Sequence, residues 1–109
     1  LAGEAPLMAK LVCVEPDGSA RPVADDLHFP NGAVIMNGGR TLVVAETFGS
    51  CLTAFDIAAD GSLSNRRCFA ALGEHTPDGI CLDTDGGIWV ASFMTSVFLR
   101  VKDGGTVTD

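Results

Sequence analysis

The sequence contains one distinctive turn twice, with Pro30 and Pro77 lying 47 residues apart. The first copy is Phe29-Pro30-Asn31-Gly32 and the second is Thr76-Pro77-Asp78-Gly79. In each copy, proline presets its own φ, the Asn or Asp side chain can bond the backbone just beyond it, and glycine tolerates the dihedrals that follow. Because an apolar run comes directly after each turn, we expect the oxygens of Asn31 and Asp78 to lie at equivalent strand entrances.

The repeat extends beyond the turn, and its spacing limits the possible folds. Counting 47 residues onward from Gly39, Val43 and Leu52 again gives glycine, valine and leucine. Short apolar runs alternate with turns rich in glycine, asparagine and aspartate, as β-strands do. A period in the forties built from such strands is typical of β-propeller blades, each with four strands. We therefore predict an all-β propeller segment with strands at 11–14, 20–24, 33–36, 41–45, 51–56, 63–70, 80–83, 88–91 and 97–101.

These strands group into about two and a half four-stranded blades. We expect residues 1–28 to form the end of one blade, 29–75 a complete blade and 76–109 most of a further blade. An open run of blades exposes apolar edges, which proteins normally cover or close. The chain is therefore predicted to be either a segment of a longer propeller or one copy of a homo-oligomer that closes the propeller.

Composition and charge exclude some classes of partner. Hydrophobic residues make up 47% of the sequence and charged residues 19%, as in a folded domain. The net charge is −7, and the longest basic run is Arg66-Arg67, so nucleic acid and anionic membranes are poor partners. The sequence shows no signal peptide and no membrane-spanning stretch, and we expect a cytoplasmic location.

The four cysteines are predicted to be reduced core residues, with a disulfide as the alternative. Cys13, Cys51, Cys68 and Cys81 lack the spacing of a zinc site. Three of them lie in apolar runs, where a free thiol behaves as a small hydrophobe. The run 33–36 is almost wholly apolar, and we expect it to be buried on both faces.

Several segments together resemble the family of senescence marker protein, gluconolactonase and luciferin-regenerating enzyme. The resemblance covers nearly all of the chain from Leu11 onward and implies a six-bladed propeller. It also implies that a divalent cation, usually calcium, is held in the central channel, and that lactones or related esters are hydrolysed there. The segments that carry the resemblance are 29–32, 40–47, 52–57, 61–67, 77–83 and 88–92.

The same resemblance implies roles for two residues. Asn31 corresponds to the asparagine of the family's Pro-Asn-Gly and Asp78 to the aspartate of its Pro-Asp-Gly. Both are metal ligands in the family, and the aspartate is also a candidate general base. Such oxygens suit calcium, with zinc and manganese as alternatives. The family's metal-binding glutamate and a channel asparagine have no counterpart in this sequence, so activity would need residues from missing sequence or another subunit.

Other residues have a structural interpretation beside a functional one. His75 comes just before the second turn and is a candidate substrate contact, with a solvated loop histidine as the alternative. Glu46 follows a buried strand, and we interpret it as a structural bond to neighbouring loops. Trp89 is expected to anchor the core. The hypothesis that competes with a lactone hydrolase is a non-catalytic fragment that self-associates as a binding or assembly module.

Overall fold

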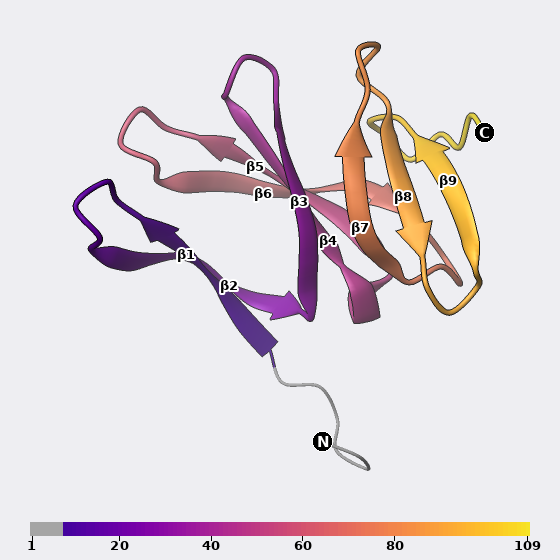
Figure 1. The fold of residues 1–109 in the computed structure, drawn as a ribbon, viewed down its shortest axis with the longest axis horizontal. Coiled ribbons are helices and arrows are strands. Elements are labelled where there is room, and N and C mark those ends of the chain that lie inside the picture. Colours follow the sequence, from indigo (N-terminus) through magenta and orange to yellow (C-terminus); the bar gives the residue numbers. More distant parts are fainter. Residues whose placement is uncertain (1–7) are drawn as a thin grey trace.

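A computed structural model describes residues 8–109, and its regular structure consists of β-strands and one short 3-10 turn (Figure 1). The all-β prediction is therefore confirmed, while residues 1–7 of the expected first blade lie outside the described part. No helix within residues 8–109 is long and apolar enough to cross a membrane. The strands are β1 (Met8–Val14), β2 (Ala20–His28), β3 (Pro30–Met36), β4 (Thr41–Glu46), β5 (Cys51–Ile57), β6 (Leu63–Ala71), β7 (Pro77–Leu82), β8 (Ile88–Ser92) and β9 (Val97–Val101), and the 3-10 turn is η1 (Thr47–Gly49).

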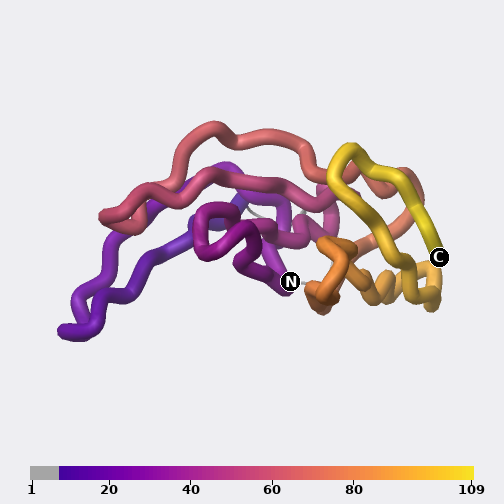
Figure 2. The backbone as a smooth tube through the Cα atoms, turned by 90° about the horizontal axis from the view of Figure 1, so that it is seen from above, coloured from indigo at the N-terminus to yellow at the C-terminus, as the bar shows by residue number. Residues whose placement is uncertain are grey.

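The strands form three antiparallel sheets that follow one another along the chain (Figure 1). Their strand orders are β1-β2, then β3-β4-β5-β6, then β7-β8-β9. Beyond β9, Val107 forms a single antiparallel bridge with Val101. Seen from above, the two outer sheets lie on opposite sides of the middle sheet (Figure 2). This succession of radially packed meanders is a β-propeller segment.

Aspartates close several of the hairpin turns between these strands. Asp17 accepts the backbone N–H of Ser19 at 2.9 Å, and Asp60 accepts that of Ser62 at 3.0 Å. These bonds are Asx turns, in which a short side chain replaces the backbone acceptor. They stabilise the ionised carboxylates, so the pKa values of Asp17 and Asp60 lie below the ordinary range.

The middle sheet packs on both of its neighbours, so its central strands are the most buried in the described chain. One face contacts the first sheet through Leu27, Val44 and Phe55. The opposite face contacts the third sheet through a larger cluster that includes Val43, Leu52, Phe69, Ile88 and Val90. Removing such aliphatic and aromatic surface from water is the main force that holds the sheets together, at about 1.5–3 kcal/mol for each fully buried side chain.

Three sequence expectations about burial are wrong. The run 33–36 is buried on one face only, because the first sheet packs over β4–β6 and leaves Ile35 of β3 59% exposed. Trp89 is also exposed, on the face of the third sheet that points away from the middle sheet. The cysteines are free, as expected, but Cys68 and Cys81 lie at the surface rather than in the core.

Candidate functional site

The two Pro-Asx-Gly turns occupy equivalent positions at the starts of β3 and β7. Pro30 pairs with Glu46, and the register then shifts before Ala33 pairs with Val44. In the third sheet Pro77 pairs with Ser92, with the same shift before Ile80. Each strand therefore carries a β-bulge in which the extra residue changes the direction of a side chain. Asn31 and Asp78 lie in these two bulges, in the segments that we call the first entrance (28–32) and the second entrance (75–79).

The structure brings the two entrances into backbone contact. A Cβ atom added to Gly32 would lie 2.7 Å from the Asp78 carbonyl oxygen and 2.8 Å from the Ile80 nitrogen. Real Cβ atoms do not approach backbone so closely, and only glycine fits between β3 and β7. Gly79, at the equivalent position of the second entrance, has open space around it. The two residues predicted as ligands thus lie on adjoining strands, β3 and β7.

Asn31 and Asp78 have the chemistry of cation ligands. Asn31 is exposed and Asp78 is half-buried. The side-chain hydrogen bonds at the entrances, within residues 8–109, involve His28, His75 and Thr76, so the amide oxygen of Asn31 and the carboxylate of Asp78 remain to accept a ligand. In that range no three His, Cys, Asp or Glu side chains group as a metal site. The two oxygens therefore fit calcium as members of a larger ligand set, because calcium takes about six to eight oxygens.

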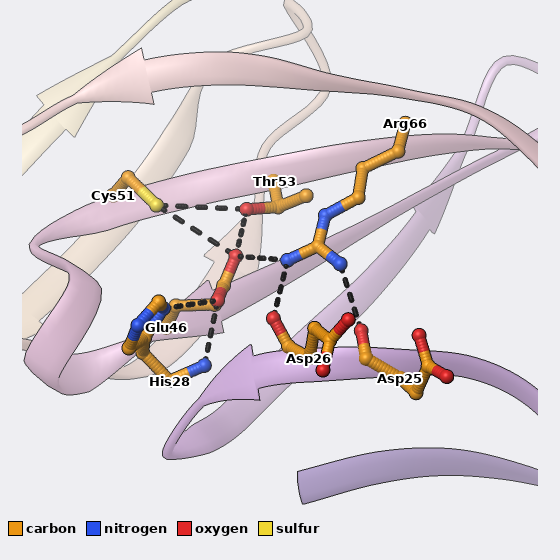
Figure 3. Close-up of polar contacts among 7 residues, drawn as sticks. All are labelled: Asp25, Asp26, His28, Glu46, Cys51, Thr53 and Arg66. Carbon is orange, nitrogen blue, oxygen red and sulfur yellow. Dashed lines mark hydrogen bonds and ion pairs between the residues drawn. The ribbon is translucent and has the colours of Figure 1, made fainter. Parts of the chain in front are cut away.

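Glu46 joins the first entrance to three strands of the middle sheet (Figure 3). Its side chain is 3% exposed, and its Oε1 accepts the backbone N–H of His28 at 2.7 Å. The hydroxyl of Thr53 donates to Oε2, and the thiol of Cys51 donates to the same atom at 3.8 Å. The interpretation of Glu46 as a structural residue is confirmed, but its partners lie in strands rather than in neighbouring loops, and the bond to His28 connects β4 with the end of β2.

Arg66 approaches the same carboxylate from β6. One guanidinium nitrogen lies 3.5 Å from Glu46 Oε2 and also donates to the Asp26 carbonyl at 2.9 Å. The other terminal nitrogen donates to the Asp25 carbonyl at 2.7 Å. The guanidinium also lies 5.8 Å from the ring centre of Phe55. Arg66 thus connects β6, the outermost strand of the middle sheet, to the first sheet. Arg66 and Asp26 are 40 residues apart, so no local sequence pattern indicates this contact.

These contacts keep the buried carboxylate ionised. Burial alone raises the pKa of Glu46, but hydrogen bonds from Thr53 and the His28 amide, with the charge of Arg66, outweigh it and lower that pKa. Burial raises the pKa of the Cys51 thiol, which keeps its proton available for donation. The Glu46 carboxylate is therefore a hydrogen-bonded structural centre of the first entrance.

Hydroxyl groups take the place of this carboxylate at the second entrance. Ser92 Oγ accepts the backbone N–H of Thr76 at 3.0 Å and lies 2.6 Å from Thr95 Oγ1. His75 Nδ1 is 2.9 Å from the same Thr95 oxygen. Thr76 Oγ1 in turn accepts the backbone N–H of Met94 at 3.0 Å. His75, the candidate substrate contact, is thereby held beside the second entrance.

An open hollow of about 490 Å³ lies next to Asp78. Its walls come from the second entrance, the end of β8, the start of β9 and the segment between these two strands. They are mostly apolar, and they include Phe93, Val97 and Phe98 together with Ser92 and Ser96. A small molecule placed there would have Asp78 at one side.

Comparison with known proteins shows the family of this sequence. The model of the SMP-30/gluconolactonase/LRE-like family matches residues 2–109. The chain belongs to this family. Regucalcin from Danio rerio is 34% identical over 96 residues, which are 85% of this chain and 32% of the regucalcin.

Solved structures of the family share the fold. A gluconolactonase from Xanthomonas campestris is 35% identical, with a TM-score of 0.75, over 90% of this chain and 32% of the gluconolactonase. Regucalcin from Agrobacterium tumefaciens, described as a calcium-binding protein, has a TM-score of 0.78 over 92% of this chain and 35% of its own length. Its identity of 21% shows the fold alone. The chain spans about a third of the length of these relatives.

Proposed function

We propose that this chain is part of a metal-dependent hydrolase of lactones or related esters, in which Asn31 and Asp78 bind a divalent cation. The observation that carries the proposal is the close packing at Gly32, which puts the bulges that contain Asn31 and Asp78 on adjoining strands. Membership of a family that includes gluconolactonases supports this function over a non-catalytic assembly module.

Calcium is the cation that this donor set favours. Amide and carboxylate oxygens are hard ligands, and the calcium-binding regucalcin of the same fold gives support from a relative. Asn31 and Asp78 would supply two oxygens, and water, substrate or other residues would supply the rest. Zinc prefers nitrogen and sulfur ligands, and the nearest such side chains at the described entrances, His28 and His75, face Glu46 and Thr95 respectively.

Asp78 is the group that moves a proton in this proposal. A bound cation would stabilise the negative charge that develops on the lactone carbonyl oxygen. A water oxygen attacks the carbonyl carbon while the Asp78 carboxylate accepts the water proton. The ring C–O bond then breaks, and the proton passes to the alkoxide oxygen, which gives the open hydroxy acid. His75, held by Thr95, contacts a substrate oxygen beside this carboxylate.

The test measures hydrolysis of gluconolactone by the purified protein, and the release of acid is the signal that is recorded. We expect activity with calcium and none after chelation. Asp78→Asn keeps an oxygen ligand but removes the proton acceptor, so the rate should fall by about 10²-fold or more. Asp85→Asn is the matched control, because Asp85 lies in the exposed β7–β8 turn and its change should leave the rate intact.

Two results would contradict the proposal. One is lactone hydrolysis that is unchanged in Asp78→Asn, and the other is the absence of lactone hydrolysis, with any added cation, by the full protein or assembly that supplies the remaining ligands. Repeating the assay with zinc and manganese in place of calcium identifies the cation. A higher rate with zinc than with calcium would overturn the choice of calcium while keeping the hydrolase.

A further inference from the structure

Thr47 lies where all three sheets meet, directly after Glu46. It is 1% exposed and begins η1. Its backbone N–H donates to the Phe29 carbonyl at 3.1 Å. Its side-chain hydroxyl donates to the Pro77 carbonyl at 2.7 Å. A single buried residue of the middle sheet is thus bonded to the backbone of both entrances.

The two carbonyls belong to residues one or two positions before the candidate ligands. Phe29 is two residues before Asn31, and Pro77 directly precedes Asp78. The contact of Gly32 with the Asp78–Ile80 backbone limits how closely β3 and β7 can approach. The two bonds of Thr47 limit how far the entrances can separate. Together these contacts define the spacing between the segments that carry Asn31 and Asp78.

The equivalent residue in the third sheet shows which bond is special to Thr47. Phe93 follows Ser92 as Thr47 follows Glu46, and its backbone N–H donates to the Thr76 carbonyl at 3.2 Å. That bond repeats the one from Thr47 to Phe29. Phe93 has no hydroxyl, however, and is 53% exposed. Of these two equivalent positions within the described chain, only Thr47 therefore bonds the next sheet through its side chain.

We propose that Thr47 is a positioning residue, whose hydroxyl fixes the separation of Asn31 and Asp78. It contacts neither a cation nor a substrate and acts through the Pro77 carbonyl. Groups that orient metal ligands from behind typically contribute 10- to 100-fold in metal affinity. The inference rests on the proposed function for the role of the two ligands, whereas the geometry that it assigns to Thr47 is independent of that role.

The decisive variant is Thr47→Val, which keeps the shape of the side chain and removes the hydroxyl. Thr47→Ser keeps the hydroxyl and is the rescue. Thr41→Val is the matched control, since Thr41 is a buried residue at the start of β4, the strand that ends next to Thr47, and its hydroxyl accepts from Asn37 at 3.0 Å. All three are compared with the wild type by urea unfolding, so that loss of stability is measured separately.

The first readout needs no cation. In two-dimensional NMR spectra of the cation-free protein, we expect Thr47→Val to shift the side-chain amide of Asn31 and the backbone amides of Asp78 and Gly79. Thr47→Ser should restore them, and Thr41→Val should leave them in place. Unchanged resonances in Thr47→Val, or equal shifts in Thr41→Val, would overturn the proposal. Thr47→Cys, which has a weak thiol donor, gives the same comparison if Thr47→Val does not fold.

The second readout is calorimetric titration with calcium alone. We expect Thr47→Val to weaken calcium binding by about 10- to 100-fold and Thr47→Ser to restore it. Equal affinity in Thr47→Val and the wild type would contradict the positioning role. A wild-type protein that binds no calcium would contradict the proposed function instead, and the cation-free spectra would still decide the role of Thr47.

Discussion

At both entrances, the residue directly after the second strand of the sheet (β4 or β8) donates its backbone N–H to the carbonyl of the residue just before the proline. Thr47 does so to Phe29, and Phe93 does so to Thr76. The side chains behind this shared backbone differ. Glu46 supports the first entrance with a buried charge that four residues contact, whereas Ser92 supports the second with a hydroxyl. The repeated sequence thus gives the same backbone path at both entrances, while different side chains accept the backbone N–H groups at each.

The largest difference is expected between Glu46→Ala and Ser92→Ala. Glu46→Ala leaves the His28 N–H and the buried Thr53 hydroxyl without their acceptor and removes the partner of Arg66. We expect a loss of about 2–4 kcal/mol in the free energy of unfolding. Ser92→Ala removes one neutral acceptor and should cost about 1 kcal/mol. Urea unfolding measures both, and equal losses would show that the charge at the first entrance has no special weight.

Gly32→Ala and Gly79→Ala are expected to differ next most. A methyl group at Gly32 pushes β3 away from the Asp78–Ile80 backbone and should cost about 1–3 kcal/mol of stability. The same change at Gly79 meets open space and should stay within about 0.5 kcal/mol. Neither glycine has a positive φ, so steric contact alone separates the two variants. Similar losses in thermal unfolding would mean that the two strands separate without cost.

Acid should weaken the first entrance more than the second. The folded state lowers the pKa of Glu46 below its ordinary value of 4.5, so this stabilisation is complete above that value and disappears as the pH falls through the folded pKa. Asp83, whose pKa is held well below its usual range by a hydrogen bond from Arg100, adds a loss of the same sign.

The measurement that isolates Glu46 is the unfolding free energy as a function of pH from about 6 to 3. We expect Glu46→Gln to flatten this profile relative to the wild type, because the ionisable group is gone. Ser92→Ala should keep the wild-type slope, since it leaves both carboxylates in place. A wild-type slope in Glu46→Gln would assign the acid sensitivity to Asp83 or other groups.

The smallest difference concerns the exposed apolar residues beside the entrances. Phe48 and Phe29 form an edge-to-face pair with ring centres 5.1 Å apart. Phe48→Ala should therefore cost about 0.5–1 kcal/mol. Met94, at the equivalent position of the third sheet, is 64% exposed, and Met94→Ala should change stability by less than about 0.5 kcal/mol. Thermal unfolding at neutral pH distinguishes them, and a cost as large at Met94 would remove the distinction.

The sequence predicts the strands and turns well because their signals are local. Apolar runs and Asx-Gly turns depend on neighbours a few residues away, and the 47-residue repeat predicts that Asn31 and Asp78 are equivalent. Burial is less predictable, since an apolar run such as 33–36 does not reveal how far the next sheet extends over it. Ile35 is exposed for that reason.

The support of the candidate site is the part that the sequence conceals. Arg66 lies 20 residues from Glu46, and no period or motif connects the two. In the sequence, Thr47 is distinguished only as the second residue of a Glu-Thr pair at the end of a buried run. Its hydroxyl bonds the Pro77 carbonyl of another sheet, 30 residues further along the chain. Such contacts depend on how the sheets pack, which no local pattern specifies. A polar pair that directly follows a buried run is the signal that would have pointed to them.

The position of the middle sheet between the other two determines when each backbone amide becomes accessible to solvent deuterium. β4 is hydrogen-bonded on both sides and almost wholly buried, so its amides should exchange only when the whole molecule opens. β1 pairs with β2 alone, and β9 pairs with β8 and with a short segment at 107–109. Both strands have exposed side chains, so they should exchange through small local openings. Deuterium exchange should therefore be fastest in the two outer sheets and slowest in β4, the strand that leads directly into Thr47.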